Sequence, residues 1–347
     1  MIFEYIVSRR RPGTRKVRRL NILDSGLRRK TLVLLCTLFW STAPAQAQDE
    51  ASRPTPEEIL ATAPAGHWLP IPVSDLMIFT LPDDKDGNPR QAVIQLLPAK
   101  FSGGHVRNIR KLARAHWWDD TKIYRVAKDF VTQFGGNPDA KPQPKNLETV
   151  PESEYYNAAL GAKRDTDMAA LKTAVEYSNQ YQKTDIKPLM KTIYENYGAK
   201  VGFGAGWPIG SKIVSGEIRY YPLTCRGSLS PAHYDPPDTG SGSEISVITG
   251  EAARSLDTTF GMVGRVIDGL EHLVELPLGD GAGGFYSDKS KYTPIQSIRM
   301  ASDLPVAEQP RYEYLASYSP SLLQHIAAHE GYGNICTFPV PIRKVTE

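Results

Sequence analysis

The chain has 347 residues, of which 41% are apolar and 23% charged, a composition typical of a soluble globular protein with one large core or two domains. Its formal charge of +3 is unevenly distributed, because residues 1–47 hold ten Lys or Arg and only two acids. The remainder has 31 basic and 36 acidic side chains, a balance of −5, which argues against nucleic acid as a partner.

Residues 1–47 have the pattern of a secretory signal peptide. Three basic residues at 28–30 precede an apolar run at 31–40, and Ala45-Gln46-Ala47 provides a small-x-small cleavage site. The apolar run is too short to span a bilayer. We therefore expect a periplasmic or secreted protein that begins at Gln48 and has no membrane anchor after cleavage. Because residues 1–22 are long for a basic region, either translation starts further downstream or they form an unstructured leader.

The next segment, residues 48–75, is predicted to be an N-terminal extension. A short helix should open at Thr55, since Pro56 and Glu58 follow it at positions that favour a helix start. β-type runs at 76–81 and 91–97 flank a polar tip, which predicts a hairpin.

Residues 93–136 read as strand, loop, helix and two short strands. Val106, Ile109 and Leu112 recur at helical spacing after Gly103-Gly104. The run 123–126 and the alternating run 130–134 then follow as β-type segments that end at two glycines.

Residues 123–136 resemble the first motif of the cyclophilin-type peptidyl-prolyl isomerases, F-H-R-[IV]-x-x-x-F-[MV]-x-Q-G-G. Arg125, Phe130, Val131 and Gln133 stand at the matching positions with unbroken spacing. The resemblance implies that Arg125 is catalytic and that the other three line the proline site.

The residue types suit that chemistry. Rotation about an X-Pro bond is slow because amide resonance opposes it, with a barrier of roughly 18–20 kcal/mol for an ordinary peptide bond. A guanidinium can donate to the imide nitrogen only when the twist has removed the resonance, so it favours the transition state over the substrate. Phe130 would supply an apolar wall, and the Gln133 amide could anchor the substrate backbone.

Residues 137–200 depart from the compact family pattern and are predicted to be a mainly helical insertion. The glycine-rich stretch 201–210 lacks the context of a nucleotide site. Residues 236–248 and 256–271 then resemble the family's second motif, a glycine-and-polar loop entering an S-Q-F-F-I strand, followed by Leu-Asp, a further strand and a closing helix.

The second motif also departs from the family at several positions. Glu244 replaces the usual Gln, Ser246 replaces the second Phe, and Phe260 replaces a His, while Leu256 is kept. The resemblance places these four residues in the substrate site with part of the pocket altered. The family's Ala-Asn pair, which binds substrate backbone, has no clear counterpart near Cys225.

The last third of the sequence contains two cysteines whose pairing remains open and two histidines that do not indicate a metal site. Cys225 and Cys336 are left after signal cleavage and could either pair or stay free. His325 and His329 have helical spacing, but without the Glu of an H-E-x-x-H motif we interpret them as surface histidines rather than metal ligands. We expect no metal and no cofactor.

The predicted fold is mainly β: a closed antiparallel cyclophilin-like barrel over residues 76–300, capped by two helices, with the insertion and a C-terminal extension at 301–347. The first functional hypothesis is an exported peptidyl-prolyl isomerase that acts on proline-containing polypeptides during folding. The alternative is a proline-peptide or protein binding module with little turnover. The sequence does not specify an oligomeric state.

Overall fold

The computed structural model describes residues 54–98, 101–136, 141–156, 200–251, 253–317, 319–329 and 335–346. The predicted signal peptide, its cleavage site and most of the predicted insertion lie outside these residues. No helix in the described part of the chain is long and apolar enough to cross a membrane.

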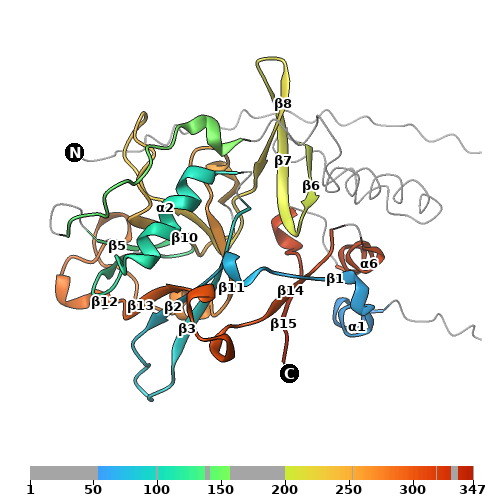
Figure 1. Cartoon of the computed structure of the whole chain (residues 1–347), viewed down its shortest axis with the longest axis horizontal. Helices are drawn as coiled ribbons and strands as arrows, with labels where there is room; N and C mark the ends of the chain where they lie inside the picture. Colours follow the sequence, from blue (N-terminus) through green and yellow to red (C-terminus); the bar gives the residue numbers. More distant parts are fainter. Residues whose placement is uncertain are drawn as a thin grey trace, which may run out of the picture. The chain divides into compact units, whose positions relative to one another are not determined.

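A curled antiparallel sheet is the largest sheet of the described residues (Figure 1). Among the described residues its strand order is β12-β4-β5-β10-β9-β11-β3-β2-β13. The bounds are β2 (Leu76–Leu81), β3 (Arg90–Leu96), β4 (Lys122–Ala127), β5 (Val131–Gly135), β9 (Ser228–Pro231), β10 (Glu244–Ile248), β11 (Gly264–Asp268), β12 (Thr293–Pro294) and β13 (Ser297–Met300). The edge strands β12 and β13 do not pair with each other, so the sheet is a half-barrel and the predicted closed barrel is not confirmed.

The chain itself connects these two edges. Between β12 and β13, the Ile295 amide donates to the Thr121 carbonyl at 2.9 Å, and the Gln296 amide donates to the Thr80 carbonyl at 3.0 Å. One short segment therefore bonds to the β4 side and to the β2 side of the curled sheet.

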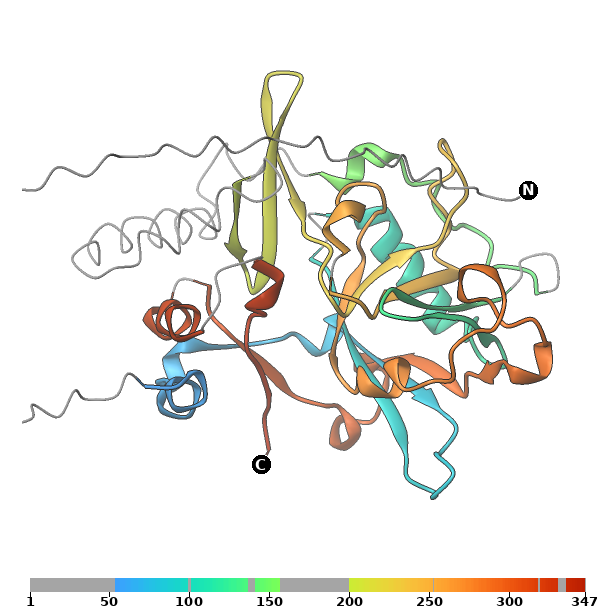
Figure 2. The same cartoon turned by 180° about the vertical axis from the view of Figure 1, so that it is seen from behind.

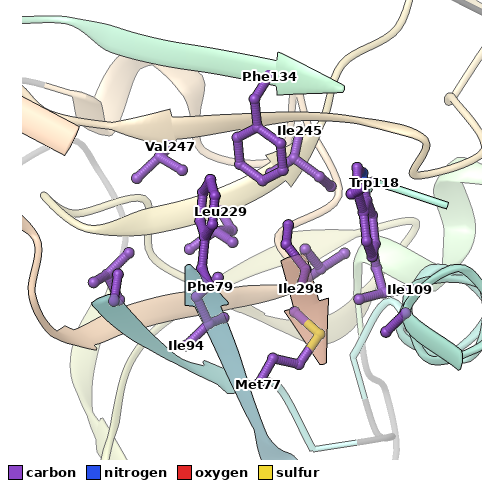
Figure 3. Packing of buried hydrophobic residues seen from close by; sticks show 14 of the residues in the cluster. Met77, Phe79, Ile94, Ile109, Trp118, Phe134, Leu229, Ile245, Val247 and Ile298 are labelled. Atoms are coloured by element: carbon purple, nitrogen blue, oxygen red, sulfur yellow. The ribbon is translucent and has the colours of Figure 1, made fainter. Parts of the chain in front are cut away.

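The main core fills the concave side of the sheet (Figure 3). Strand residues alternate between the two faces, so that Phe79, Ile94 and Phe134 all point inward and are at most 1% exposed. The Phe79 and Phe134 rings lie 4.8 Å apart. Burying a side chain of this size contributes about 1.5–3 kcal/mol, so this cluster stabilises the curled sheet.

Helix α2 (Gly103–Arg114) packs its apolar face, including Ile109 and Leu112, into the main core. The helix predicted after the second motif is a single turn, α5 (Glu271–Val274), whose Leu273 is fully buried. Residues 141–156 run along α2 and end in the 3-10 turn η3 (Glu152–Tyr155), with Val150 buried against the domain.

The N-terminal and C-terminal extensions form one accessory region, which the sequence did not predict. Strand β1 (Trp68–Pro70) pairs with β14 (Tyr312–Leu315), and β14 pairs with β15 (Ile342–Lys344). Helix α1 (Pro56–Thr62) lies beside α6 (Pro320–Ala328) in both views (Figures 1 and 2). The predicted start of α1 is confirmed, because Thr55 and Glu58 form a reciprocal capping box.

A three-stranded sheet follows the predicted insertion and packs on both cores. Its strands are β6 (Lys200–Gly204), β7 (Trp207–Val214) and β8 (Glu217–Pro222). Trp207 is 2% exposed and belongs to the main core, where the Arg265 guanidinium lies 4.2 Å from its ring centre. Val201 and Tyr221 belong instead to the core of the accessory region.

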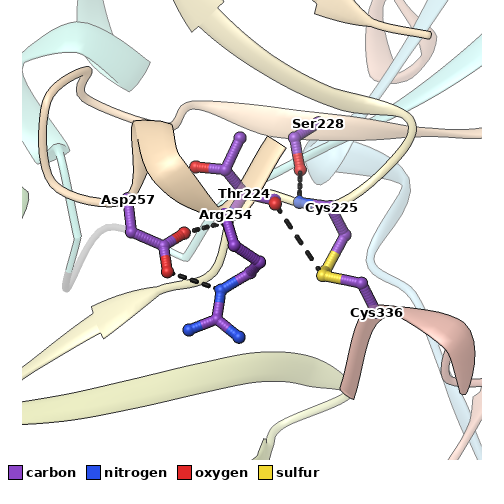
Figure 4. Close-up of a disulfide and its surroundings, with 6 residues drawn as sticks. All are labelled: Thr224, Cys225, Ser228, Arg254, Asp257 and Cys336. Atoms are coloured by element: carbon purple, nitrogen blue, oxygen red, sulfur yellow. Dashed lines mark hydrogen bonds and ion pairs between the residues drawn. A yellow bond between two sulfur atoms is a disulfide. The ribbon is translucent and has the colours of Figure 1, made fainter. Parts of the chain in front are cut away.

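Cys225 and Cys336 form a disulfide, which settles the pairing that the sequence left open (Figure 4). The bond joins the segment before β9 to η11 (Ile335–Thr337) across 111 positions of sequence. Beside it, Asp257 accepts from the Thr224 amide at 2.8 Å and pairs with the buried Arg254 at 2.5 Å. The Leu-Asp of the second motif thus helps to hold the cysteine-bearing turn.

Candidate functional site

A β-bulge in the β4–β5 hairpin determines which side chains face outward. Ile123 pairs with Phe134, but the next partner of β5, Gln133, pairs with Arg125, so that Tyr124 is the extra residue. Ile123 and Val126 both point into the core. The bulge therefore puts Tyr124 and Arg125 together on the opposite face, where a strictly alternating strand would place only one of them.

The Arg125 guanidinium is held on two edges. Its Nε donates to the Gly283 carbonyl at 2.8 Å, and its Nη1 donates to Gln133 Oε1 at 3.1 Å. Its central carbon lies 5.6 Å from the ring centre of Phe130 and 4.9 Å from that of Phe285. These rings are 40% and 44% exposed, so the cation contacts two aromatic side chains that also face solvent.

The segment that supplies Gly283 and Phe285 is bonded along β4. The Gly279 amide donates to the Val126 carbonyl at 3.0 Å, and the Tyr286 amide donates to the Tyr124 carbonyl at 3.2 Å. Gly284 has φ +83°, and a Cβ added there would lie 2.6 Å from the Cα of Ala127. Only glycine permits this close approach, so the local sequence places the 3-10 turn η7 (Ala282–Gly284) against the arginine.

A row of polar side chains crosses four strands beside Arg125. Gln133 pairs directly with Ser246 of β10, and Ser246 pairs with Ser230 of β9. Directly paired residues of an antiparallel ladder share one face. The structure therefore brings the predicted residues Arg125, Gln133 and Ser246 together.

Glu244 lies two residues before Ser246 on β10, so both side chains are on the same face, and it pairs with Gly135. Burial raises the pKa of the Glu244 carboxyl, while its interaction with the Tyr124 hydroxyl acts in the opposite direction. Burial and then Glu244 raise the pKa of Tyr124 well above its ordinary value. Burial lowers the pKa of Arg125, while the neighbouring Tyr124 acts in the opposite direction.

Two predicted site residues, Val131 and Leu256, are not among the described side chains that contact Arg125. Val131 is only 2% exposed and pairs with Ile248 and Ala127 in the sheet, so it contributes to packing rather than to the exposed surface of the site. Leu256 ends the 3-10 turn η6 (Ala253–Leu256) and is half-buried, and the contacts of the described residues do not join it to Arg125.

Phe260 contacts one member of a residue pair, Ala232-His233, that the sequence interpretation missed. Its ring lies 4.5 Å from that of His233, which follows β9. The preceding Ala232 amide donates to the Glu244 carbonyl at 2.9 Å, so Ala232-His233 runs past the acidic end of the polar row. The sequence signal for this pair is its place shortly before the glycine-and-polar loop, rather than near Cys225.

Gly283 and Phe285 were also missed, because they are 158 and 160 positions away from Arg125. A sequence signal existed in the run Gly-Ala-Gly-Gly-Phe, which indicates a tight turn that presents an aromatic residue. Nothing in that run specifies which strand the turn contacts.

The arrangement combines one oriented donor with apolar rings and an amide. The printed bonds of Arg125 engage Nε and Nη1, which leaves Nη2 without a partner among the described residues. In the described part of the chain, no three His, Cys, Asp or Glu side chains form a group that could hold a metal ion. The site can therefore bind an apolar ring and donate hydrogen bonds to the groups beside it.

Comparison with known proteins relates the chain to one family. The model of the family described as cyclophilin type peptidyl-prolyl cis-trans isomerase/CLD matches residues 92–301. No curated protein matches the chain.

Among solved structures, the chain is similar to the cyclophilin AquaCyp293 from Hirschia baltica. The two are 19% identical with a TM-score of 0.59, and the match covers 84% of this chain and 97% of the other. A cyclophilin type peptidyl-prolyl cis-trans isomerase from Cryptosporidium parvum, crystallised in the presence of the dipeptide Ala-Pro, is 14% identical with a TM-score of 0.33 and covers 65% of this chain and 97% of its own. The first likeness supports the fold.

Proposed function

Because this chain belongs to the family of cyclophilin-type peptidyl-prolyl cis-trans isomerases, we propose that it catalyses the cis-trans isomerisation of X-Pro bonds in polypeptides that fold after export. The observation that carries the proposal is the restrained Arg125 guanidinium, which contacts the rings of both Phe130 and Phe285. Gly283 and Gln133 occupy two of its edges and leave Nη2 for a substrate.

The reaction needs no covalent step. The prolyl ring packs against Phe130. The side-chain oxygen of Gln133 accepts from Arg125, and the side-chain nitrogen of Gln133 donates to the substrate backbone. As the imide twists, its nitrogen loses resonance and becomes a pyramidal acceptor. Arg125 then donates to it, so the hydrogen bond forms only in the twisted state and lowers the barrier without strengthening ground-state binding.

The β10 side of the site has a different composition. Glu244, Ser246 and Phe260 stand where the resemblance implies Gln, Phe and His, and we assign Ala232-His233 to the backbone-binding pair. Because Ser246 lies directly opposite Gln133, the prolyl ring meets a polar side chain on that side. We therefore expect slower catalysis than in a relative with the full motif.

The same substitutions favour a second candidate function, a proline-peptide binding module with little turnover. A protease-coupled isomerisation assay with an Ala-Pro peptide distinguishes the two functions. Acceleration above the uncatalysed rate supports the isomerase. Peptide binding measured by calorimetry without acceleration supports the binding module, and neither binding nor acceleration refutes both.

Export is proposed on two grounds. Residues 1–47 have the signal-peptide pattern, and the Cys225–Cys336 disulfide is of the kind that persists in oxidising compartments. N-terminal sequencing of protein from its native host should find Gln48 first. An N-terminus at Met1 or within residues 31–40 would contradict the proposal.

A further inference from the structure

Helix α6 ends in two histidines whose ring nitrogens face each other. The Nε2 atoms of His325 and His329 are 3.1 Å apart, and the ring centres are 4.6 Å apart with nearly perpendicular planes. His325 is only 6% exposed and His329 is half-buried. The interpretation of both as surface histidines is therefore wrong for His325, because α1 packs over it.

The tautomer of His325 follows from its other nitrogen. Its Nδ1 lies 3.4 Å from the carbonyl oxygen of Pro56, and a carbonyl can only accept, so Nδ1 carries the proton. The lone pair of His325 is then on Nε2 and points at His329. A ring oriented by an Nδ1–H bond to a backbone carbonyl is the usual arrangement of a metal-ligating histidine.

The electrostatics around the pair also suit a cation, because the exposed Glu57 carboxylate of α1 interacts with His325 and contributes negative potential there.

We propose that His325 and His329 bind one divalent transition-metal ion of the kind that prefers imidazole, Zn²⁺ or Cu²⁺, through their two Nε2 atoms. Zinc–imidazole bonds are about 2.0–2.1 Å long, which separates two nitrogens on one ion by about 2.9 Å at a right angle and about 3.4 Å at the tetrahedral angle. The observed 3.1 Å lies within this interval. Water completes the coordination, since the described residues supply no third ligand of this kind.

Metal binding replaces the hydrogen bond between the two Nε2 atoms and leaves the net charge of the rings unchanged. Without the ion, one ring donates an N–H to the other, and His325 already uses Nδ1 for Pro56, so the donor is His329 Nε2–H. With the ion bound, His329 takes the tautomer protonated at Nδ1 and offers its Nε2 lone pair. Neutral rings therefore bind the ion without releasing a proton.

The site also connects parts of the accessory region. His325 bonds to Pro56 at the start of α1, and the His329 ring lies 5.6 Å from that of Phe338, just beyond the disulfide. An ion that binds only the folded arrangement stabilises it by mass action, so metal should raise the melting temperature.

The test is titration of tag-free protein with Zn²⁺ and, separately, Cu²⁺ near pH 7.5, with Mg²⁺ as the negative control. We expect one equivalent of Zn²⁺ or Cu²⁺ to bind and to raise the melting temperature. His329→Gln should weaken binding at least about tenfold, or ~1.4 kcal/mol. The matched control, His116→Gln, alters an exposed histidine near α2 and should bind like the wild type.

Electron paramagnetic resonance of the Cu²⁺ complex provides a measurement that does not depend on a variant. Hyperfine coupling to two imidazole nitrogens supports the site. Coupling to one nitrogen, unchanged affinity in His329→Gln, or no binding of either ion at about 100 times the protein concentration would overturn the proposal.

Discussion

Replacing Arg125 with alanine should remove most of the isomerase activity and leave the fold intact. In the resting protein the guanidinium makes hydrogen bonds to Gly283 and Gln133 and contacts two half-exposed rings. Contacts of this kind with exposed rings contribute about 0.5–1 kcal/mol each to stability. The variant should therefore remain folded, with a denaturation midpoint close to that of the wild type.

The loss in rate should be larger than the loss in stability. Removing one donor aimed at a transition-state acceptor costs about 10²–10³-fold in kcat, or about 2.7–4 kcal/mol. Because the imide nitrogen accepts only when twisted, peptide affinity should change little while kcat falls. Arg125→Lys should recover little, since an ammonium cannot bond to Gly283, Gln133 and substrate through one planar fork.

The assay is protease-coupled cleavage of an Ala-Pro peptide near 10 °C, where the uncatalysed isomerisation takes minutes. Calorimetric titration with the same peptide measures affinity separately. Arg219→Ala is the matched control, because this arginine pairs with Glu217 on β8 and not with site residues. If Arg125→Ala kept the wild-type rate, the arginine mechanism would be wrong.

Three further changes test neighbouring features. Phe285→Ala should lower kcat about two- to fivefold, the equivalent of one cation–π contact with Arg125, and an unchanged rate would show that the ring does not orient the guanidinium. Burial raises the folded-state pKa of Glu244, so the stability that its carboxyl contributes is present at acid pH and is lost as the pH rises through that pKa. In thermal melts, the stability of Glu244→Gln relative to the wild type should therefore increase from about pH 4 to pH 7. A decrease would refute this. Cys336→Ser should lower the free energy of unfolding by about 2–5 kcal/mol in urea titrations under oxidising conditions, whereas equal midpoints would argue against a Cys225–Cys336 bond.

Local patterns predicted the parts of this molecule that depend on neighbours in sequence. The capping box at Thr55 and Glu58 required only residues within one helical turn. The predicted alternation holds for Phe134, which lies in the core, and Gln133, which contacts Arg125, but not for Phe130, which precedes β5 and is 40% exposed. These elements are correct because one short segment contains all the contacts that specify them.

The missed features depend on contacts between distant segments. Trp68 pairs with Leu315, and no local pattern records a partner 247 positions away. The same limit applies to the burial of His325, which is caused by α1. Strands β6 and β7 were hidden for another reason, since their glycines resemble loop sequence and become strand only when their neighbours pair.

The two sides of the candidate site differ in how far they retain the family pattern, and this difference bears on both proposed functions. On the β4–β5 side, the bulge, the Gly283 carbonyl and Gln133 together fix the guanidinium, which is the group that distinguishes catalysis from binding. On the β10 side, Ser246 removes an apolar contact that would act on the prolyl ring in the planar and twisted states alike. Such uniform binding affects affinity more than turnover. The altered residues should therefore weaken peptide affinity, so that the slower catalysis expected of this chain should appear mainly in KM, while kcat depends on the orientation of Arg125.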